Sequence, residues 1–250
     1  MAIPAGVESG GAYVELSYMS PVHGRVRRPM LDCVTSRFEH VAPVRPFRWS
    51  RGERHFPGWY WAATTGQHVG FESWLERDRL VLMDFDPAVV GIGSQPFWLH
   101  WHDGERERRH APDYFVRRAD GSAVVVDVRA EDRIAPQDAE AFAVTRLACV
   151  QAGWEFERVG VPEPVLLANV RWLSRYRHPR CLRCPAADRL LEVFAEPGLL
   201  LAGADAAGDR LATLPSLFHL LWRRDLVAAG LEEELLGPRT VVGLPGGGTE

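Results

Sequence analysis

The sequence predicts an α/β fold built on one central mixed sheet, because helical and strand patterns alternate along its middle part. Apolar residues recur at helical spacing over residues 71–85 and again over 136–153. Short apolar runs bounded by turn residues predict strands at 89–92, 97–101, 113–116, 123–128 and 154–159. The resulting order of helix, strands, helix and strand is typical of a sheet covered by helices.

The first predicted helix has an apolar face and a charged flank. Its apolar face comprises Phe71, Trp74, Leu75, Val81, Leu82 and Phe85. Glu72, Glu76 and Arg79 fall on the opposite flank of a helical wheel. The helix is expected to end at Asp86, because Pro87 disfavours helical geometry in the residue before it. Glu76 is therefore expected on a rigid element, away from the apolar face.

Residues 113–116 and 123–128 are expected to pair as a β-hairpin around the turn Ala119-Asp120-Gly121. The continuous run Val124-Val125-Val126 indicates a second strand that is buried on both faces. Asp127 interrupts this strand, and a buried charge is costly unless it is paired or bound to a metal. A strand with a purely structural role would carry another valine at this position.

Residues before 60 lack a long helical period and predict a β-rich leader packed on the main domain. Short strands are expected at 13–18, 33–34 and 38–41, with a turn at 21–24. A charged loop is expected at 102–109, a strand at 165–167 and a helix at 168–176. In the helix predicted at 136–153, the expected core residues are Phe142, Leu147 and Val150.

The pattern breaks near residues 178–185, which predicts two domains, 1–178 and 179–250. In the smaller domain, helices are expected at 186–195 and 214–222, followed by a strand at 239–244. Helices followed by a β-hairpin fit a winged-helix-like module. The glycine-rich tail 245–250 is expected to be disordered.

Composition places the chain among ordinary globular proteins. It has 250 residues, of which 46% are hydrophobic and 25% charged. No apolar stretch approaches the about 20 residues that a membrane helix needs, and the first residues show no secretory signal. A cytoplasmic protein without a membrane partner is therefore expected.

The net charge of −4 argues against a protein that binds DNA tightly by itself. Delivery to DNA by a partner is favoured instead. Arginines are nevertheless clustered, at Arg25, Arg27, Arg28, Arg37, Arg45, Arg48, Arg51 and Arg54 and again at Arg171, Arg175, Arg177, Arg180 and Arg183. Such clusters can contact phosphates, but for any single arginine a solvated surface position is the more common role.

The four cysteines do not predict a disulfide framework, because no secretory signal accompanies them. His178, Cys181 and Cys184 lie close together in the sequence and offer three zinc ligands. A structural zinc site needs a fourth ligand, and no second pair has matching spacing. Incidental thiols are therefore the favoured interpretation.

Four residues together predict a phosphodiester-cleaving site: Glu76, Asp113, Asp127 and Arg129. Asp127 and Arg129 are two residues apart on one strand, so their side chains should share a face. Asp113 opens the neighbouring strand, and Glu76 could close the cluster from the preceding helix. Grouped carboxylates repel each other unless a cation lies between them, and Mg²⁺ prefers oxygen ligands. A Mg²⁺-bound water could then attack phosphorus.

Taken singly, three of these residues have ordinary explanations. Glu76 could be a solvated helix residue, Asp113 a turn residue after proline, and Arg129 a member of a surface ion pair. Glu72 is an alternative to Glu76 as the helix carboxylate. Their joint order and spacing favour the functional interpretation.

Several motifs in this order resemble the PD-(D/E)xK nuclease superfamily, and most closely the TnsA family, the endonuclease subunit of heteromeric transposases. The matching segments are Thr65-Gly66, Ser73-Trp74-Leu75-Glu76, Leu82 to Asp86, Ser94-Gln95-Pro96-Phe97, His110 to Val116 and Val125 to Arg129. The resemblance as a whole covers roughly residues 60–176. The resemblance implies a restriction-endonuclease-like core and a C-terminal region that binds the partner and DNA.

The resemblance also implies roles for individual residues. Glu76, Asp113 and Asp127 match the metal-ligand positions, Arg129 matches the lysine position of the xK motif, and Gln95 is implied as a supporting residue. Mg²⁺ is the implied cofactor, with Mn²⁺ expected to substitute. The implied activity is cleavage of the non-transferred strand at transposon ends, beside a TnsB-like DDE transposase in a bacterial nucleoid.

Two departures from the family pattern bear on activity. Asp127 is shorter than the usual Glu or Gln, which would draw a metal nearer the strand. Arg129 keeps a positive charge but cannot serve as a base at neutral pH. A catalytically idle nuclease-fold subunit for DNA binding or assembly is therefore one alternative. A nuclease of the same superfamily in plasmid maintenance or phage defence is another.

Overall fold

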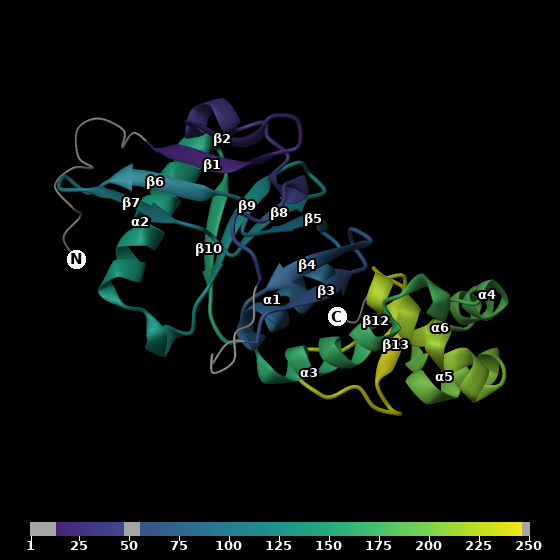
Figure 1. Cartoon of the computed structure of the whole chain (residues 1–250). Coiled ribbons are helices and arrows are strands. Elements are labelled where there is room, and N and C mark those ends of the chain that lie inside the picture. The colour runs from purple at the N-terminus through teal and green to yellow at the C-terminus, as the bar shows by residue number, and fades with distance from the viewer. Residues whose placement is uncertain (1–13, 48–55, 247–250) are drawn as a thin grey trace. The chain divides into compact units, whose positions relative to one another are not determined.

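A computed structural model describes residues 14–47 and 56–246 of the chain (Figure 1). The described residues form two compact units. The first contains the residues up to Leu80 together with Ala88–Val161, and the second contains Val81–Pro87 and the residues from Pro162 onward. The expected α/β character is confirmed, with several sheets and six α-helices among the described residues.

The first unit contains the mixed sheet that the sequence predicts. Its strands, in spatial order, are β10 (Glu155–Val159), β9 (Ala123–Val128), β8 (Tyr114–Arg118) and β5 (Val89–Ser94). β10 runs parallel to β9, and the other pairs are antiparallel. Gly121 has φ 87°, and the Asp120 carboxylate accepts a hydrogen bond from the Ser122 amide at 2.8 Å. These two features close the β8–β9 turn where the sequence places it.

A second sheet in the same unit is antiparallel. It contains β2 (Gly24–Pro29), β1 (Glu15–Ser20), β6 (Trp98–His102) and β7 (Glu107–His110) in that order. The expectation of a single central sheet is wrong here, because β6 pairs with β1. The charged loop expected at 102–109 is also wrong in part. The Asp103 carboxylate accepts the amides of Glu105 and Arg106 at 2.9 Å and turns the chain into the polar strand β7.

The strands expected at 33–34 and 38–41 are instead short 3₁₀ helices, η1 (Met30–Cys33) and η2 (Phe38–His40). Cys33 and Phe38 are fully buried. In η2 the neighbouring residues Phe38 and Glu39 are both buried, which the alternating faces of a strand would not allow. Another such turn, η3 (Glu131–Arg133), follows β9.

Helix α1 (Trp74–Phe85) begins three residues later than expected. Phe71 belongs to β4 (Gln67–Phe71), which forms a two-stranded hairpin with β3 (Gly58–Ala62). Gly66, with φ 67°, lies in their turn. The expected faces of the helix are also wrong at two positions, because Trp74 is exposed and Glu76 is buried.

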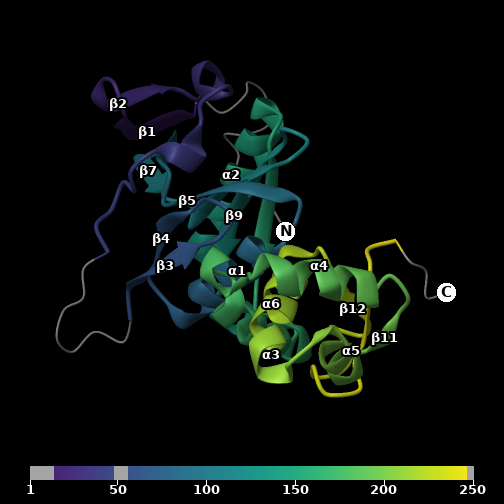
Figure 2. The same ribbon diagram turned by 90° about the vertical axis from the view of Figure 1, so that its right-hand side faces the viewer.

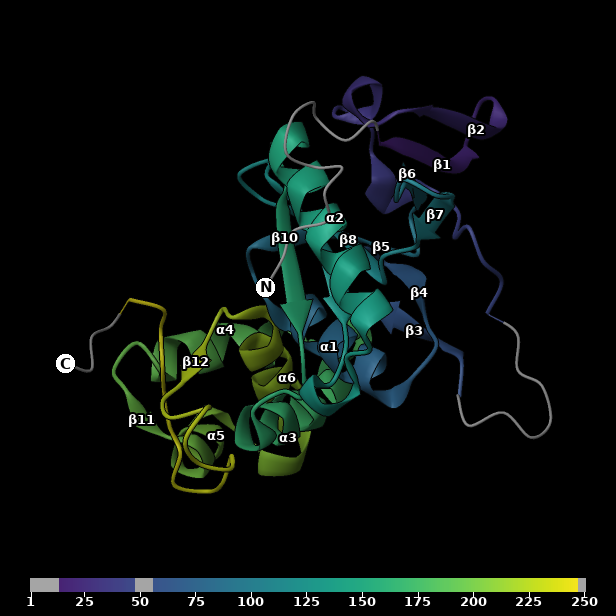
Figure 3. The ribbon, with the colours of Figure 1, turned by 90° about the vertical axis from the view of Figure 1, so that its left-hand side faces the viewer.

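Helix α2 (Pro136–Ala152) is confirmed and packs along β10 (Figure 3). Gly153 ends it with φ 69°, the left-handed conformation that favours glycine after a helix. Phe142 is buried as expected. Leu147 and Val150 are exposed, so their assignment to the core is wrong.

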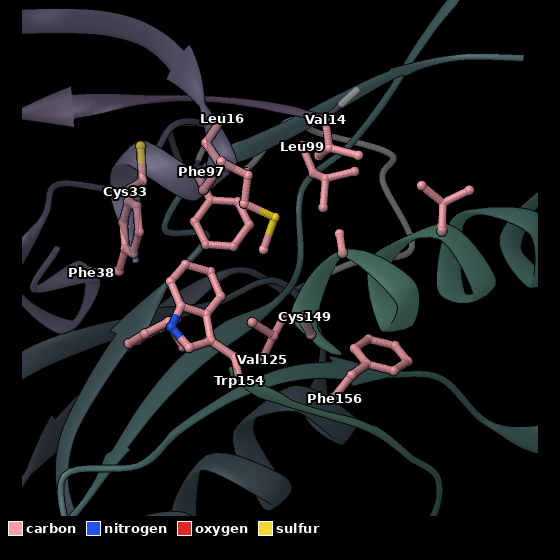
Figure 4. Packing of buried hydrophobic residues seen from close by; sticks show 14 of the residues in the cluster. Val14, Leu16, Cys33, Phe38, Phe97, Leu99, Val125, Cys149, Trp154 and Phe156 are labelled. Carbon is pink, nitrogen blue, oxygen red and sulfur yellow. The ribbon is translucent and has the colours of Figure 1, made fainter. Parts of the chain in front are cut away.

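One hydrophobic core joins both four-stranded sheets to α2 (Figure 4). Leu16 and Leu99 enter it from the antiparallel sheet, Val125 from the mixed sheet and Cys149 from α2. Phe38 lies among the rings of Tyr18, Phe97, Phe115 and Trp154, with centroid distances of 5.0, 4.9, 5.5 and 5.7 Å. The leader thus supplies part of the core.

The second unit is mainly helical (Figure 2). Its helices are α3 (Pro164–Leu173), α4 (Cys184–Val193), α5 (Leu200–Ala207) and α6 (Arg210–Arg223), with 3₁₀ turns η4 (Ser174–Tyr176) and η5 (Pro179–Cys181). The short strands β11 (Gly198–Leu199), β13 (Val241–Gly243) and β12 (Val227–Ala228) pair in that order.

The expected helices at 186–195 and 214–222 and the strand within 239–244 are confirmed in outline. The strand expected at 165–167 is wrong, because Pro164 occupies the first turn of α3, where its missing N–H is tolerated. Across the described parts of the chain, no helix combines the length and apolarity needed to cross a membrane. The expectations for Tyr13, Arg48, Arg51, Arg54 and residues 247–250 lie outside the described residues.

Candidate carboxylate site

Asp113 and Asp127 lie beside each other at one end of the mixed sheet. β8 and β9 pair with Tyr114 opposite Val126. Asp113 precedes Tyr114 and Asp127 follows Val126, so the two aspartates continue the same register across the two strands. Asp113 Oδ2 also accepts the Val128 amide hydrogen at 2.7 Å. The hairpin therefore brings together two of the predicted carboxylates.

Asp127 is 2% exposed and is held by a histidine. His110 Nε2 lies 3.0 Å from Asp127 Oδ1 and 2.9 Å from Oδ2. His110 is the last residue of β7, so this contact links the two four-stranded sheets. Its ring also meets Phe142 edge-on, at a centroid distance of 6.0 Å. The charge of Asp127, costly in an apolar strand, thus has a partner.

Sequence reasoning gives His110 no role in the site. The one feature of the sequence that could have pointed to His110 is its position three residues before Asp113, directly before Ala111-Pro112. The chain crosses from one sheet to the other over residues 110–113, and both ends of this crossover contact β9. A contact between two sheets has no periodicity in the sequence, so pattern analysis could not reveal it.

The Glu76 side chain caps the N-terminal end of α1. Its Oε2 accepts the Glu72 amide hydrogen at 2.7 Å, and its Oε1 accepts the Ser73 hydroxyl hydrogen at 2.8 Å. Ser73 Oγ in turn accepts the Glu76 amide hydrogen at 3.1 Å. Ser and Glu three residues apart are the signature of a capping box. Glu72, the alternative helix carboxylate, pairs with Arg45 at 2.9 Å.

Replacing Ser73 with alanine tests this cap. Ser73→Ala should lower the free energy of unfolding by about 1 kcal/mol, because it removes the side-chain acceptor at the helix start. Urea denaturation followed by circular dichroism measures the loss. Thr35→Ala removes an exposed hydroxyl from the same unit and should change stability by less than about 0.5 kcal/mol. Equal effects of the two changes would show that the cap contributes nothing.

The carboxylates act on each other electrostatically. The pKa of Asp113 is raised well above its ordinary value, first by desolvation and then by the charges of Glu76 and Asp127. The Val128 hydrogen bond and the charge of Arg129 lower this pKa in part. Desolvation likewise raises the pKa of Glu76, against the hydrogen bonds from Glu72 and Ser73. Glu76, Asp113 and Asp127 therefore form one electrostatic cluster, here called the carboxylate cluster.

Arg129 lies one residue beyond the end of β9. The alternation of side chains along the strand therefore does not determine which face of the sheet its side chain takes. Its Nε lies 3.8 Å from Asp138 Oδ2, and the Arg129 side chain is 45% exposed. The Asp138 carboxylate also accepts the Ala135 amide hydrogen at 3.3 Å at the start of α2. Arg129 is thus paired with α2 while its charge still acts on Asp113.

Gln95 directly follows β5 and is 1% exposed. Its backbone amide donates to the Asp113 carbonyl at 2.8 Å, and its carbonyl accepts the Val44 amide hydrogen at 2.9 Å. Its φ is 43°, a left-handed value for a residue other than glycine. Among the described residues, neither Oε1 nor Nε2 of its side chain has a hydrogen-bond partner. The supporting residue that the resemblance implies thus lies next to Asp113.

The kinds of donor in this region suit Mg²⁺, which prefers carboxylate and amide oxygens. The side-chain amide oxygen of Gln95, which has no hydrogen-bond partner among the described residues, is a neutral donor of this kind. Within residues 14–47 and 56–246, however, no three His, Cys, Asp or Glu side chains are grouped as a metal centre requires. His110 and the α1 cap already hold two of the three carboxylates.

The zinc candidates do not form a metal centre among the described residues. His178 Nδ1 accepts the Arg180 amide hydrogen at 3.1 Å and caps η5. Cys181 and Cys184 are free thiols. Several arginines of the first cluster have acidic partners, including Arg27 with Glu15 at 2.6 Å.

An α/β protein with a carboxylate cluster at the end of a mixed sheet is the class that this fold and site define. Comparison of the sequence with models of known protein families and with curated proteins gives no match.

Proposed function

We propose that the chain is a metal-dependent DNA endonuclease subunit of a heteromeric transposase, with a restriction-endonuclease-like core. The carboxylate cluster carries this proposal. Asp113 and Asp127 lie side by side at a sheet end, and the charge of Glu76, on the preceding helix, acts on Asp113. Carboxylates that raise one another's pKa are stabilised by a divalent cation between them.

Glu76, Asp113 and Asp127 would hold Mg²⁺, and Mn²⁺ should substitute. Bound there, the ion supplies an activated water and offsets charge on the phosphate. The β8–β9 register, which sets Asp113 opposite Asp127, supports this proposal, and Glu76 would have to leave its α1 cap to join them. His110 must share or release the Asp127 oxygens for a metal to bind them.

Arg129 would bind the phosphate rather than accept a proton, because a guanidinium stays charged at neutral pH. Its pairing with Asp138 is long, at 3.8 Å, and partly exposed. Such pairs contribute at most about 1 kcal/mol. A DNA phosphate could therefore displace Asp138 at little cost.

The proposed substrate is DNA at transposon ends, cut on the non-transferred strand beside a TnsB-like DDE transposase. The net charge of −4 supports delivery by such a partner, because strong independent DNA binders are usually basic. The helices and three short strands of the second unit support its proposed role as a winged-helix-like module for partner or DNA binding.

A non-catalytic nuclease-fold subunit is the second candidate. The observation that favours it is that His110 contacts both oxygens of Asp127 while Glu76 serves as a helix cap. In that case the cluster is a structural remnant, and its ion pairs and caps only stabilise the fold.

Nicking of supercoiled DNA with Mn²⁺ or Mg²⁺ separates the two candidates. Asp127→Asn should reduce nicking by at least about 100-fold, the scale of losing one fixed transition-state stabiliser. Asp205→Asn, which changes an exposed aspartate paired with Arg210, should leave the rate unchanged. If the wild-type protein nicks DNA neither alone nor with a DDE transposase, the non-catalytic candidate is the correct one.

A further inference from the structure

Helix α1 begins at a tryptophan whose side chain lies largely in water. Trp74 is 52% exposed, and its ring centroid lies 6.1 Å from that of Phe56, which is 53% exposed. The guanidinium of Arg77, one turn later on α1, lies 4.5 Å from the centre of the Trp74 ring. Aromatic side chains stabilise the fold mainly when they are buried. Two exposed rings side by side therefore indicate a surface that contacts another molecule.

A second tryptophan, Trp98 at the start of β6, holds two arginines. The guanidinium of Arg109, on β7, lies 4.3 Å from the centre of the Trp98 ring, and that of Arg45 lies 5.6 Å from it. Arg109 is exposed and, among the described residues, forms no hydrogen bond or ion pair. A guanidinium that stacks on an aromatic ring can still donate its N–H groups to oxygen acceptors. Trp98 thus fixes a positive charge that a phosphate can reach.

Arg45 connects the Trp98 stack to the start of α1. Its Nη2 lies 2.9 Å from Glu72 Oε2, and Glu72 lies two residues before Trp74. The charge of Arg45 also acts on Glu76, a member of the carboxylate cluster. The exposed rings at the start of α1 are therefore close to one part of the site that is proposed to cut DNA.

Arg109 is close to another part of the same site. It directly precedes His110, whose Nε2 lies 2.9 Å from Asp127 Oδ2. A phosphate bound by Arg109 would thus belong to the DNA that reaches the carboxylate cluster.

The combination of exposed rings and arginines fits nucleic acid better than an apolar protein surface. Aromatic rings stack on bases, and nearby arginines bind the phosphates that join those bases. The bases of an intact duplex stack on one another, so a protein ring can stack only on a base that is unpaired or at an end. The surface is therefore suited to a strand with unpaired bases.

We propose that Trp74 and Phe56 form a stacking platform for an unpaired DNA base, and that Arg109, held on Trp98, binds a phosphate of that DNA. The inference rests on the proposed function for its substrate, DNA. It adds the form of that substrate, which is a strand that is locally unpaired next to the cut.

Binding in buffer with EDTA tests the platform, because a metal-dependent nuclease cuts nothing there. Fluorescence anisotropy compares a labelled single strand with a duplex of the same sequence at low salt, where phosphate contacts are strongest. Trp74→Leu should raise the Kd for the single strand about 10-fold, the scale of one lost base stack, and the Kd for the duplex by less than about twofold. Trp74→Phe keeps an aromatic ring and should stay within about threefold of the wild-type protein.

The phosphate contact is tested with two arginines of the β6–β7 hairpin. Arg109→Ala should weaken binding of both forms of DNA and lower the salt dependence of the Kd by about one phosphate contact. Arg106 is exposed in the turn before β7 and, among the described residues, contacts no aromatic ring. Arg106→Ala removes the same charge and should change the Kd by less than about twofold.

The outcomes distinguish this inference from the proposed function. A wild-type protein that binds no single strand, or an unchanged Kd in Trp74→Leu, would overturn the inference. Equal losses in Trp74→Leu and Trp74→Phe would also overturn it, because stacking needs only an aromatic ring. Either result leaves the nuclease proposal standing if nicking depends on Asp127. Binding that depends on Trp74 without any nicking would support the platform in a non-catalytic subunit.

Discussion

Replacing Asp113 with asparagine is expected to abolish metal-dependent nicking and, at the same time, to stabilise the metal-free protein at neutral pH. Desolvation and the charges of Glu76 and Asp127 raise the pKa of this carboxyl well above 3.8. Its ionised form is therefore unfavourable in the folded chain. Asparagine keeps an oxygen that can accept the Val128 amide hydrogen, so the sheet end should stay intact. The negative charge that a metal needs is lost.

The pH dependence follows from the direction in which the pKa of Asp113 moves. Below about pH 3.8, Asp113 is protonated in both the folded and the unfolded chain. As the pH rises, the unfolded chain releases this proton first, so folding stability falls until the pH passes the raised pKa. The asparagine of the variant does not titrate. The stability gained by Asp113→Asn should therefore grow across this window, by about 1.4 kcal/mol for each pH unit.

Urea denaturation of the metal-free proteins between about pH 4 and pH 8 measures this gain. Asp205→Asn is the matched control. Hydrogen bonds with Arg210 lower the pKa of Asp205, which is exposed, so its loss should leave stability unchanged or slightly reduced. An Asp113→Asn variant that is less stable than the wild-type protein at neutral pH would contradict the destabilising interactions assigned to the carboxylate cluster.

Replacing Phe38 with alanine should cause the largest loss of stability, about 3–5 kcal/mol. Phe38 is fully buried, and four aromatic rings surround it at centroid distances of 4.9 to 5.7 Å. These rings come from β1, from β8, from the residue before β6 and from the residue before β10. Rigid rings on different elements cannot easily move into the cavity that the Phe38 ring leaves. Most of its packing contacts are therefore not replaced.

The unfolding free energy from urea titration, with tryptophan fluorescence as the signal, measures this loss. Val22→Ala shortens an exposed side chain of the same leader and should change stability by less than about 0.5 kcal/mol. A Phe38→Ala loss below about 1 kcal/mol would mean that the leader does not share the core of the first unit.

The elements with a clear hydrophobic period could be predicted from the sequence. The valine run of β9, the turn at Gly121 and the helix that Gly153 ends all lie where local pattern and turn chemistry place them. The pairing of Asp113 with Asp127 follows from that hairpin alone. These features depend on residues that are near each other in the sequence.

The features that could not be predicted depend on contacts between distant segments. β7, with the sequence Glu-Arg-Arg-His, has no apolar alternation, and it becomes a strand only because β6 lies beside it. The same pairing places His110 against Asp127. The helical wheel places Glu76 on the flank opposite the apolar face, but its side chain is buried and makes capping hydrogen bonds at the start of α1. The unpaired amide of Gln95 has no signature in a single sequence.

The pairing of β6 with β1 sets a lower limit on the size of a fragment that can fold as the first unit does. The motifs that resemble a nuclease begin near residue 60, yet Leu99 of β6 lies opposite Leu16 of β1. A protein that started at residue 60 would expose the edge of β6 to water and remove Phe38 from its place against the mixed sheet. The pairing of β7 with β6 would then weaken, and His110, the last residue of β7, would lose its fixed position. Efforts to shorten this protein should therefore leave the leader in place.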